Sequence, residues 1–444
     1  MADSTRGHVD EEALDEVVRF TSDLIRIDTT NRGGGDCQER PAAEYAAEQL
    51  AGAGLEPTLL ERTKGRTNVV ARIEGTDPSA DALLVHGHLD VVPAQAEDWS
   101  VHPFSGEIRD GVVWGRGAVD MKNMDAMILA VVRAWARLGV RPRRDLVIAF
   151  TADEEASAED GSGFLADEHA GLFEGCTEGI SESGAFTFHD GSGRQIYPIA
   201  AGERGTGWLK LTARGRAGHG SKVNRANAVT RLAEAIARIG AHEWPVRLTP
   251  TVRAALTELA ALYGIDPDLE DPDGVDVLLG KLGPAAALVE PTVRNSANPT
   301  MLDAGYKVNV IPGEAVAYVD GRYLPGGEDE FRTTLDRLTG PDVDWEFHHR
   351  EAALQSPVES ATFARMRAAV EEFAPEGHVV PFCMSGGTDA KQFSRLGITG
   401  YGFSPLKLPE GYDYGALFHG VDERVPVEAL HFGVHVLDRF LRTA

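Results

Sequence analysis

The stretch that most constrains the fold is Leu83–Pro93, with the sequence LLVHGHLDVVP, an apolar run interrupted by three polar side chains. Apolar residues on both sides of the run indicate a strand buried on both faces, as in a parallel sheet covered by helices. His86, His88 and Asp90 recur at every second position, so a strand over Ala82–Val92 would place them on one face. Buried imidazoles and carboxylates are costly to desolvate, so each needs a partner or a metal ion. This strand alone leaves a hydrogen-bonded core histidine and a metal ligand equally open.

The composition is that of a soluble globular protein with an acidic surface. The chain has 444 residues, enough for two domains, and 69 Asp and Glu against 43 Lys and Arg give a formal net charge of −26. Such a charge repels phosphate backbones and anionic membranes, which argues against a nucleic-acid or membrane partner. The three cysteines are widely spaced and support neither a disulfide framework nor a zinc knuckle. The polar stretch Met1–Asp10 lacks the apolar core of a secretory signal, so we expect a cytoplasmic enzyme.

Alternating helical and strand patterns in the first part of the chain predict a three-layer α/β domain with a mostly parallel central sheet. The expected helices are Asp10–Ile27, Arg40–Gly52 and Ala126–Leu138, and the expected strands are Asn68–Ile73, Ala82–Val92 and Leu146–Thr151. After the first helix, a flexible loop is expected at Thr29–Gly35.

A β-α-β-β-α-β order follows, which is typical of a ferredoxin-like α+β sandwich. Its expected elements are Gly207–Arg214, Ala226–Ile239, Tyr306–Ile311, Ala315–Tyr323, Glu328–Leu338 and Val343–His348, with an insertion over Glu243–Ala297. Such a unit can fold on its own. We therefore predict a catalytic domain over residues 1–202 and 352–444, and an inserted lid or dimerisation domain over residues 203–351.

Several carboxylates lie where a strand or a glycine-rich turn ends. In open α/β sheets, ligands bind beyond the carboxyl ends of the strands. Glu154 and Glu155 follow the strand expected at Leu146–Thr151, Glu182 ends a short apolar segment, and Asp120 follows the turn GRGAV. Taken alone, Asp120 is more often a helix cap than a ligand, and paired glutamates are usually a solvated turn. In such a pair, one glutamate could instead be a metal ligand and the other a general base.

Together with a late histidine, His419, these motifs resemble a family of co-catalytic zinc amidohydrolases and metallopeptidases. The family includes aminoacylase, acetylornithine deacetylase, succinyl-diaminopimelate desuccinylase, carboxypeptidases and dipeptidases. The resemblance covers nearly the whole chain, because the motifs occur in order as HGHLDVVP, GRGAVDMK, the Glu-Glu pair, GHGS, NVIPG, SGGTDA and HGVDE. It implies a catalytic domain with zinc-peptidase topology.

The resemblance also implies two zinc ions, for which cobalt or manganese could substitute. The implied ligands are acids and imidazoles: His88 and Glu182 on one ion, Glu155 and His419 on the other, and Asp120 bridging both. Asp90 would hold the ring of His88. Glu154 would be the general base. The Asp120–Met121 peptide bond would be cis.

Further implied residues concern the substrate. His219 would donate to the oxyanion, in many family members from the other subunit of a dimer. Gly220 stands where the family often has serine, which leaves the path of this loop open. The residues implied to contact the substrate's free carboxylate are Asn309, Arg322, Gly387 and Thr388. Arg322 could instead pair with a nearby acid. His86 and His102 are expected to be supporting or structural residues.

The predicted activity is dinuclear metal-dependent hydrolysis of an amide bond next to a free α-carboxylate. A carboxypeptidase or dipeptidase is expected first, and an N-acyl-amino-acid deacylase is the alternative, since both reactions need the same metal site. A catalytically silent metal-binding or amino-acid-binding relative is the third hypothesis, and the retained Glu154 argues against it. We expect a small peptide or an N-acyl amino acid as the substrate, and a homodimer formed through the inserted domain.

Overall fold

The structure, a computed structural model, describes residues 9–34 and 37–444. They form two compact units. The first comprises the chain up to Ala200 together with Ser356–Pro381 and Thr388–Ala444, and the second comprises Ala201–Gln355 together with Phe382–Gly387. This division differs from the predicted one mainly at Phe382–Gly387, which was assigned to the catalytic domain. Most of the predicted polar N-terminus and Gly35 of the predicted loop lie outside the described residues.

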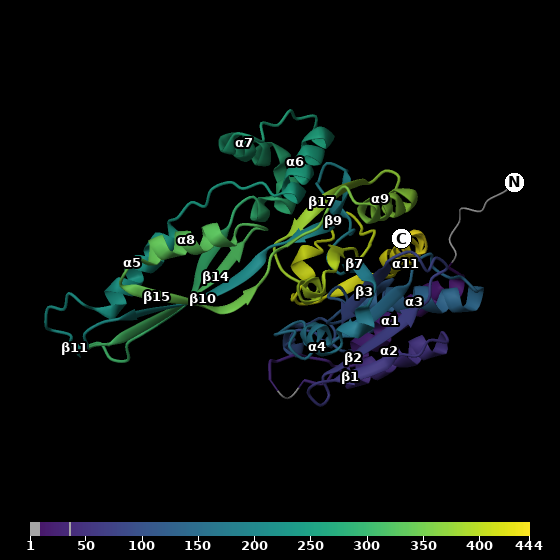
Figure 1. The fold of residues 1–444 in the computed structure, drawn as a ribbon, viewed down its shortest axis with the longest axis horizontal. Coiled ribbons are helices and arrows are strands. Elements are labelled where there is room, and N and C mark those ends of the chain that lie inside the picture. Colours follow the sequence, from purple (N-terminus) through teal and green to yellow (C-terminus); the bar gives the residue numbers. More distant parts are fainter. Residues whose placement is uncertain (1–8, 35–36) are drawn as a thin grey trace. The chain divides into compact units, whose positions relative to one another are not determined.

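The first unit is built on a sheet that is parallel at its centre and antiparallel at its edges (Figure 1). Seven neighbouring strands of this ten-stranded sheet are, in spatial order, β1 (Thr58–Glu61), β2 (Thr67–Ile73), β6 (Leu146–Thr151), β3 (Ala82–His88), β7 (Cys176–Ser181), β18 (Thr399–Gly402) and β9 (Gln195–Glu203). The other three, β8 (Phe188–His189), β16 (Leu354–Gln355) and β17 (His378–Met384), pair with β9. β3 and β6 are buried along their whole length, as their apolar runs predict. The predicted fold class, an α/β domain with a mostly parallel central sheet, is confirmed.

Helices cover both faces of this sheet. The long helices that pack together over one face are α1 (Glu11–Arg26), α2 (Arg40–Gly52), α3 (Lys122–Leu138), α9 (Ala361–Phe373) and α11 (Val427–Thr443). On the other face, α4 (Ser162–Glu168) and α10 (Ala390–Phe393) bury Phe164 and Phe393 against Leu84 of β3. Each such side chain contributes roughly 1.5–3 kcal/mol when fully buried. No helix within the described ranges is both long enough and apolar enough to cross a membrane.

Two differences between the predicted and observed element boundaries affect the site. β3 ends at His88 instead of Val92, because the chain leaves the ladder after Leu89 donates to the carbonyl of Thr151. His86 and His88 therefore share a strand face, but Asp90 does not lie on the strand. α3 begins at Lys122, directly after Asp120 and Met121, and not at Ala126.

The second unit has the predicted β-α-β-β-α-β order. Its four-stranded antiparallel sheet has the order β12 (Ser296–Ala304), β14 (Glu314–Tyr323), β10 (Gly205–Arg214) and β15 (Val343–Glu351). α5 (Ala228–Gly240) and α8 (Glu328–Thr339) pack their apolar faces on one side of the sheet, where every second residue of β10 is buried (Figure 1). This alternation is typical of a sheet that is covered on one face only.

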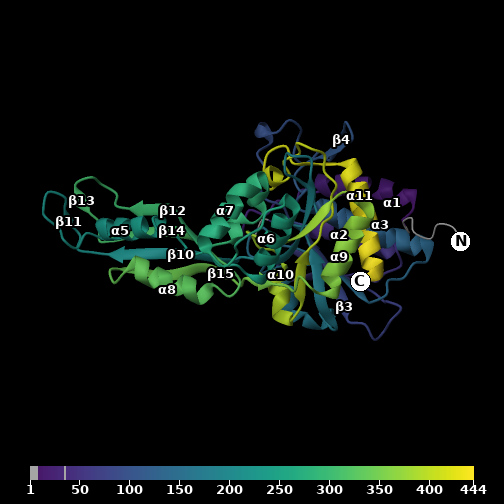
Figure 2. The same ribbon diagram turned by 90° about the horizontal axis from the view of Figure 1, so that it is seen from above.

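The second strand of this unit was predicted in the wrong place. The prediction put it at Tyr306–Ile311, but the strand that pairs with β14 is β12. β12 is an edge strand with mostly exposed side chains, so it lacks the apolar alternation by which strands are recognised. Only Val310–Ile311 forms a short strand, β13, and it pairs with β11 (Gly218–His219) (Figure 2). The helical insertion that precedes β12 contains α6 (Pro250–Tyr263) and α7 (Pro272–Leu282).

Candidate metal centre and active site

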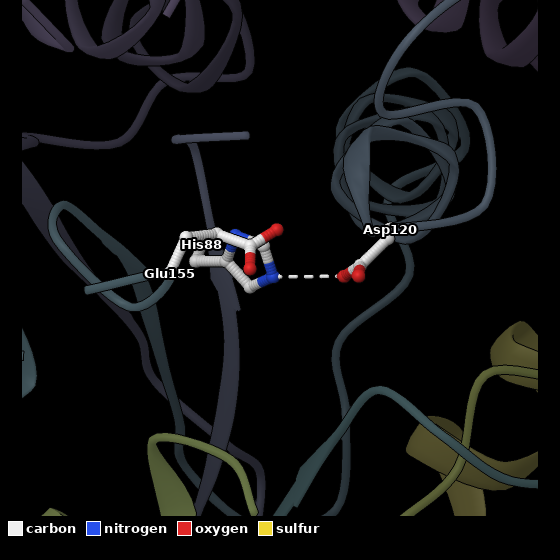
Figure 3. A group of neighbouring side chains, drawn as sticks. All are labelled: His88, Asp120 and Glu155. Atoms are coloured by element: carbon white, nitrogen blue, oxygen red, sulfur yellow. Dashed lines mark hydrogen bonds and ion pairs between the residues drawn. The ribbon is translucent and has the colours of Figure 1, made fainter. Parts of the chain in front are cut away.

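Six acidic and imidazole side chains of the first unit meet beyond the ends of its strands and turns. They are His88, Asp120, Glu154, Glu155, Glu182 and His419. One oxygen of the Asp120 carboxylate, Oδ1, lies 3.1 Å from Nε2 of His88, and the other, Oδ2, lies 3.3 Å from Nε2 of His419. Figure 3 shows Asp120 facing His88, with Glu155 beside the ring. Asp120 therefore faces two different imidazoles at once.

The remaining carboxylates divide between these two imidazoles. Oε1 of Glu182 lies 3.7 Å from Nε2 of His88. Oε2 of Glu155 lies 3.1 Å from Nε2 of His419. The geometry thus has two halves, each with one imidazole and one further carboxylate, joined by Asp120.

This donor set fits divalent cations. His88, Asp120 and Glu155 each offer a ligand atom within 4.8 Å of the others, and His88, Glu154 and Glu182 form a second such group. Imidazole nitrogens and carboxylate oxygens suit zinc, cobalt and manganese. Oε1 of Glu155 is buried without a hydrogen-bond partner, although a buried carboxylate oxygen normally has one. A cation at this place would satisfy it.

The pKa values of the carboxylates also favour a site for cations. Burial raises the pKa of Glu154 and of Glu182 well above the ordinary value, and neighbouring carboxylates raise both further. Burial and the charge of Asp120 also raise the pKa of Glu155. Burial alone would favour neutral Asp120, but hydrogen bonds from the two imidazoles outweigh it and hold its pKa well below the usual range. The cluster holds more negative charge than its two imidazoles can neutralise, so bound cations would stabilise it.

The tautomer of His88 leaves one nitrogen available for a metal. Nδ1 lies 3.0 Å from the backbone carbonyl of Asp90, which can only accept, so Nδ1 carries a proton. Nε2 then points at Asp120. Burial would favour the neutral ring, but the carboxylates of Asp120 and Asp90 raise the pKa of His88 well above its ordinary value. A proton on Nε2 in the metal-free protein is therefore the one a cation would replace.

Asp90 also positions the two glutamates. Its buried carboxylate accepts hydrogen bonds from the backbone N–H groups of Glu154 (3.2 Å) and Glu155 (3.1 Å) and from Nδ2 of Asn31 (2.8 Å). Burial opposes its ionisation, but His88 and these donors lower the pKa of Asp90. Asp90 thus fixes His88 through its backbone carbonyl and the turn that carries the Glu-Glu pair through its carboxylate.

A buried network that the sequence reasoning missed supports this turn. Asp153 has a left-handed backbone conformation (φ 65°), and its carboxylate accepts from Asn31 (3.2 Å) and from Arg66 (2.8 Å). Arg66 also pairs with Glu39 at 2.9 Å, and all three charged side chains are buried. The signal in the sequence was weak, because each residue lies far from the others along the chain.

Asp120 does not cap the following helix. The N-cap of α3 is Met121, and no side chain caps the helix there. The Asp120–Met121 peptide bond is cis, as predicted. Gly117, three residues earlier, has a φ of +89°, and a Cβ there would lie about 3 Å from Lys122 and Val91. This turn therefore requires glycine and directs Asp120 towards the imidazoles.

His86 and His102, which the sequence indicates to be supporting or structural residues, make no contact with the six side chains in the hydrogen bonds and ring contacts described next. His86 is buried and packs edge-on against Phe393, with ring centroids 4.9 Å apart. Burial lowers the pKa of His86 to about 3. Nδ1 of His102 accepts a hydrogen bond from the backbone N–H of Phe104 at 3.2 Å.

In the second unit, two of the predicted substrate residues lie next to each other. β11 and β13 pair His219 with Val310, and the N–H of Gly220 donates to the carbonyl of Asn309 at 2.9 Å. A Cβ on Gly220 would lie 3.2 Å from the backbone of Asn309, a close contact that a side chain there would have to push apart slightly. Nδ1 of His219 accepts from the N–H of Ser221 (3.2 Å), so the neutral ring carries its proton on Nε2 and can donate there.

Arg322 of β14 has partners within its own unit. Its guanidinium pairs with Asp320 on the same strand at 2.7 Å and donates to Oγ1 of Thr206 at 3.2 Å. Arg322 therefore pairs with a nearby acid, which is the alternative that the sequence left open. Gly387 belongs to the second unit, whereas Thr388 belongs to the first, where its carbonyl accepts from the N–H of Lys391.

Comparison with known proteins identifies the family. Residues 84–443 match the model of peptidase family M20/M25/M40. The human N-fatty-acyl-amino acid synthase/hydrolase PM20D1 is 30% identical over 391 residues, which cover 84% of this chain and 76% of that protein. Aminoacylase-1 of Sus scrofa is 26% identical over 418 residues, covering 90% of this chain and 89% of that protein.

Solved structures agree with this at the level of the fold. An M20 family metallo-carboxypeptidase from Sulfolobus solfataricus superimposes with a TM-score of 0.70 at 18% identity, covering 96% of this chain and 99% of that one. Human carnosine dipeptidase 1 gives a TM-score of 0.65 at 17% identity, with 97% and 96% covered. The chain therefore belongs to peptidase family M20/M25/M40 and is a hydrolase of that family. This confirms the resemblance drawn from the sequence motifs.

Proposed function

We propose that the protein is a dinuclear metal hydrolase that cleaves an amide bond next to a free α-carboxylate. One observation carries this proposal: the two oxygens of Asp120 face two imidazoles, each of which has a further carboxylate beside it. Such an arrangement suits two cations that share one bridging carboxylate. His88, Asp120 and Glu182 would hold one ion, and Glu155, Asp120 and His419 the other.

Glu154 is proposed as the general base. It lies in the same turn as Glu155, and its ligand atom lies within 4.8 Å of those of His88 and Glu182. Two bound cations would supply Lewis acidity, which polarises the scissile carbonyl and makes water a stronger acid. Glu154 would take the proton from the water whose oxygen attacks the carbonyl carbon, and would then protonate the leaving nitrogen as the carbon–nitrogen bond breaks. Burial raises the pKa of Glu154 in the metal-free protein, and two bound cations would oppose this shift and favour the carboxylate that accepts the proton.

We propose that His219 donates a hydrogen bond from Nε2 to the oxyanion of the tetrahedral intermediate. The hydrogen bond from Ser221 to Nδ1 supports this role, because it keeps the proton on the other nitrogen. Asn309 and Arg322, with amides of the Gly387–Thr388 loop, would bind the substrate's carboxylate. An arginine can bind a carboxylate with two parallel hydrogen bonds.

N-acyl amino acids are the first substrates to test. The relative at 30% identity is named an N-fatty-acyl-amino acid synthase/hydrolase and the relative at 26% an aminoacylase, and both match over most of this chain. Dipeptides are the second candidate, since a probable carboxypeptidase S-like protein of Dictyostelium discoideum is 27% identical over 378 residues. Both classes have an amide bond and a free carboxylate, so the metal site itself does not separate them.

A substrate panel tests this proposal. Purified protein is assayed with N-acetyl and longer N-acyl amino acids, with dipeptides, and with the same compounds capped as carboxyl amides. The proposal predicts hydrolysis of at least one uncapped class and much weaker hydrolysis of the capped forms. Equal rates for capped and uncapped compounds would contradict the carboxylate requirement.

Homodimerisation through the inserted unit and a cytoplasmic location stay predictions. Light scattering of the purified protein would measure the mass of the assembly, and a mass of one chain would exclude a role for His219 across a dimer.

A further inference from the structure

The geometry points to Glu423 as a positioning residue that holds the turn of Asp120 and the loop of His419 in a fixed relation. This inference rests on the proposed metal site, and it assigns a task to a residue outside the set proposed to bind metal or substrate. Glu423 is fully buried and lies four residues after His419.

The carboxylate of Glu423 accepts hydrogen bonds from four donors on the turn that leads to Asp120. Oε2 accepts from Nη1 of Arg116 (2.7 Å) and from the N–H of Gly117 (3.0 Å). Oε1 accepts from the N–H groups of Val119 (2.7 Å) and Asp120 (3.1 Å). The backbone amide of Asp120 itself is therefore held by this side chain.

Strand pairing also brings the two segments together, independently of the side chain of Glu423. β5 (Val112–Trp114) runs into the Asp120 turn, and β19 (Arg424–Pro426) follows directly after Glu423. The two strands pair antiparallel, and the N–H of Gly115 donates to the backbone carbonyl of Glu423 at 2.9 Å. Glu423 thus continues the ladder by one residue and then bonds the turn through its side chain.

Arg116 extends the connection to the neighbouring loops. Its guanidinium lies 5.1 Å from the ring centroid of Trp99, and its Nη2 lies 3.4 Å from the carbonyl of Pro93 and 3.5 Å from that of His419. Pro93 ends the segment that carries His88 and Asp90. The buried pair of Arg116 and Glu423 therefore touches all three loops that supply Asp120, His88 and His419.

These four donors need two oxygens that each accept two hydrogen bonds. In Glu423→Gln, one oxygen would become an NH₂ group, which cannot accept and would face two donors. A buried donor left without an acceptor must move or bind elsewhere. The resulting shift would reach Asp120 first, because its own N–H is one of the four donors. Since Asp120 is proposed to bridge both cations, both should bind more weakly.

Metal retention tests this inference without any measurement of activity. Zinc-loaded full-length wild type, Glu423→Gln and Arg116→Lys are dialysed against increasing concentrations of a chelator, and zinc per chain is counted by mass spectrometry. We expect Glu423→Gln to lose both ions at about 10- to 100-fold lower chelator concentration, the usual effect of removing a group that supports a metal ligand. Arg116→Lys should shift in the same direction by less, and it carries the test if Glu423→Gln does not fold.

Asp438→Asn is the matched control. Asp438 is a fully buried carboxylate of the same unit that is also paired to an arginine, Arg442 at 3.0 Å, and it accepts from Nε1 of Trp135 at 2.6 Å. Its replacement should lower thermal stability but leave the chelator curve of the wild type unchanged. Wild-type retention in both Glu423→Gln and Arg116→Lys, or an equal loss in Asp438→Asn, would overturn the inference. Wild-type protein that retains two zinc ions yet hydrolyses no substrate would refute the proposed function and leave this result standing.

Discussion

The loops of the proposed metal site in the first unit are fixed by buried hydrogen bonds, whereas two predicted substrate residues of the second unit are exposed to solvent. Asp90 and Glu423 are fully buried, and each accepts hydrogen bonds from backbone amides next to a proposed metal ligand. His219 and Asn309 instead lie exposed, on and beside the short β11–β13 pair.

This difference indicates which residues of the site the fold holds in a fixed geometry before substrate binds. A buried carboxylate that loses one donor leaves an unpaired group in a region without water, so its geometry is strongly enforced. An exposed side chain can exchange its partner for water at little cost. We therefore expect changes in the first unit to affect metal binding and kcat. In the second unit, loss of the proposed oxyanion donor His219 should lower kcat, and loss of a residue proposed to bind the substrate's carboxylate should raise KM.

The largest effect is expected for the proposed base. Glu154→Gln should lower kcat by about 10²- to 10⁴-fold, the usual contribution of a positioned general base, and should leave two metals bound. Steady-state kinetics and metal counting check this together. Glu159→Gln, an exposed glutamate of the same turn, serves as the control and should keep wild-type activity. Full activity in Glu154→Gln would show that the base is another group.

A proposed ligand should behave differently from the base. Glu155→Gln removes the carboxylate beside His419 and should weaken one of the two ions by on the order of 100-fold or more, because removing mere support for a ligand costs about 10- to 100-fold. Calorimetric zinc titration of the metal-free protein should then show one tight site in place of two. Two unchanged sites would remove Glu155 from the ligand set.

A residue of the second unit should change KM. Arg322→Ala should raise KM for substrates with a free carboxylate by about 10- to 100-fold, since a hydrogen bond to a charged group contributes about 1.5–3 kcal/mol, and should change kcat little. Arg350→Ala, which removes an exposed ion pair with Glu328 in the same unit, is the control. If Arg322→Ala lowers stability but leaves KM unchanged, Arg322 only pairs with Asp320.

The smallest effect concerns stability and pH. His86 has a pKa of about 3 in the folded protein and about 6.5 in the unfolded chain, so between these values only the unfolded chain binds the proton. The contribution of neutral His86 to the free energy of unfolding is therefore complete above pH 6.5 and is lost as the pH falls towards 3. Lowering the pH from 7.5 to 5 should reduce the free energy of unfolding by roughly 2 kcal/mol through this group.

Urea unfolding of metal-free protein at these two pH values measures that cost. His86→Leu should lose less stability on acidification than the wild type by about this amount. His378→Leu, at an exposed position, should follow the wild type. An identical pH dependence in wild type and His86→Leu would contradict the assignment.

The sequence predicted the parts of the molecule that depend on local pattern. β3 and β6 are continuous apolar runs, and α1 has apolar residues at helical spacing behind the cap of Asp10, so their position follows from neighbouring residues alone. β12 was missed because an exposed edge strand needs no buried side chains, and its only strong signal is its pairing with β14.

The candidate site divides in the same way. The motifs that carry His88, Asp120 and His419 are visible in the sequence, and the family resemblance implies the division of the site into two halves. The residues alone do not predict that division, because it depends on distances between loops. Glu423 is the last residue of the HGVDE motif, yet its role depends on backbone amides more than 300 positions earlier in the chain. Contacts of that range are fixed by the sheet and by β5–β19 pairing, which no local pattern reveals.

The central claim is that two cations bound by these side chains are required for hydrolysis. Its most direct test is to strip the protein with a chelator, return zinc or cobalt in measured amounts, and follow the hydrolysis of the best substrate against metal bound per chain. The account predicts no activity in the stripped protein and full recovery at two metal ions per chain. Undiminished hydrolysis by protein that retains no metal would contradict it.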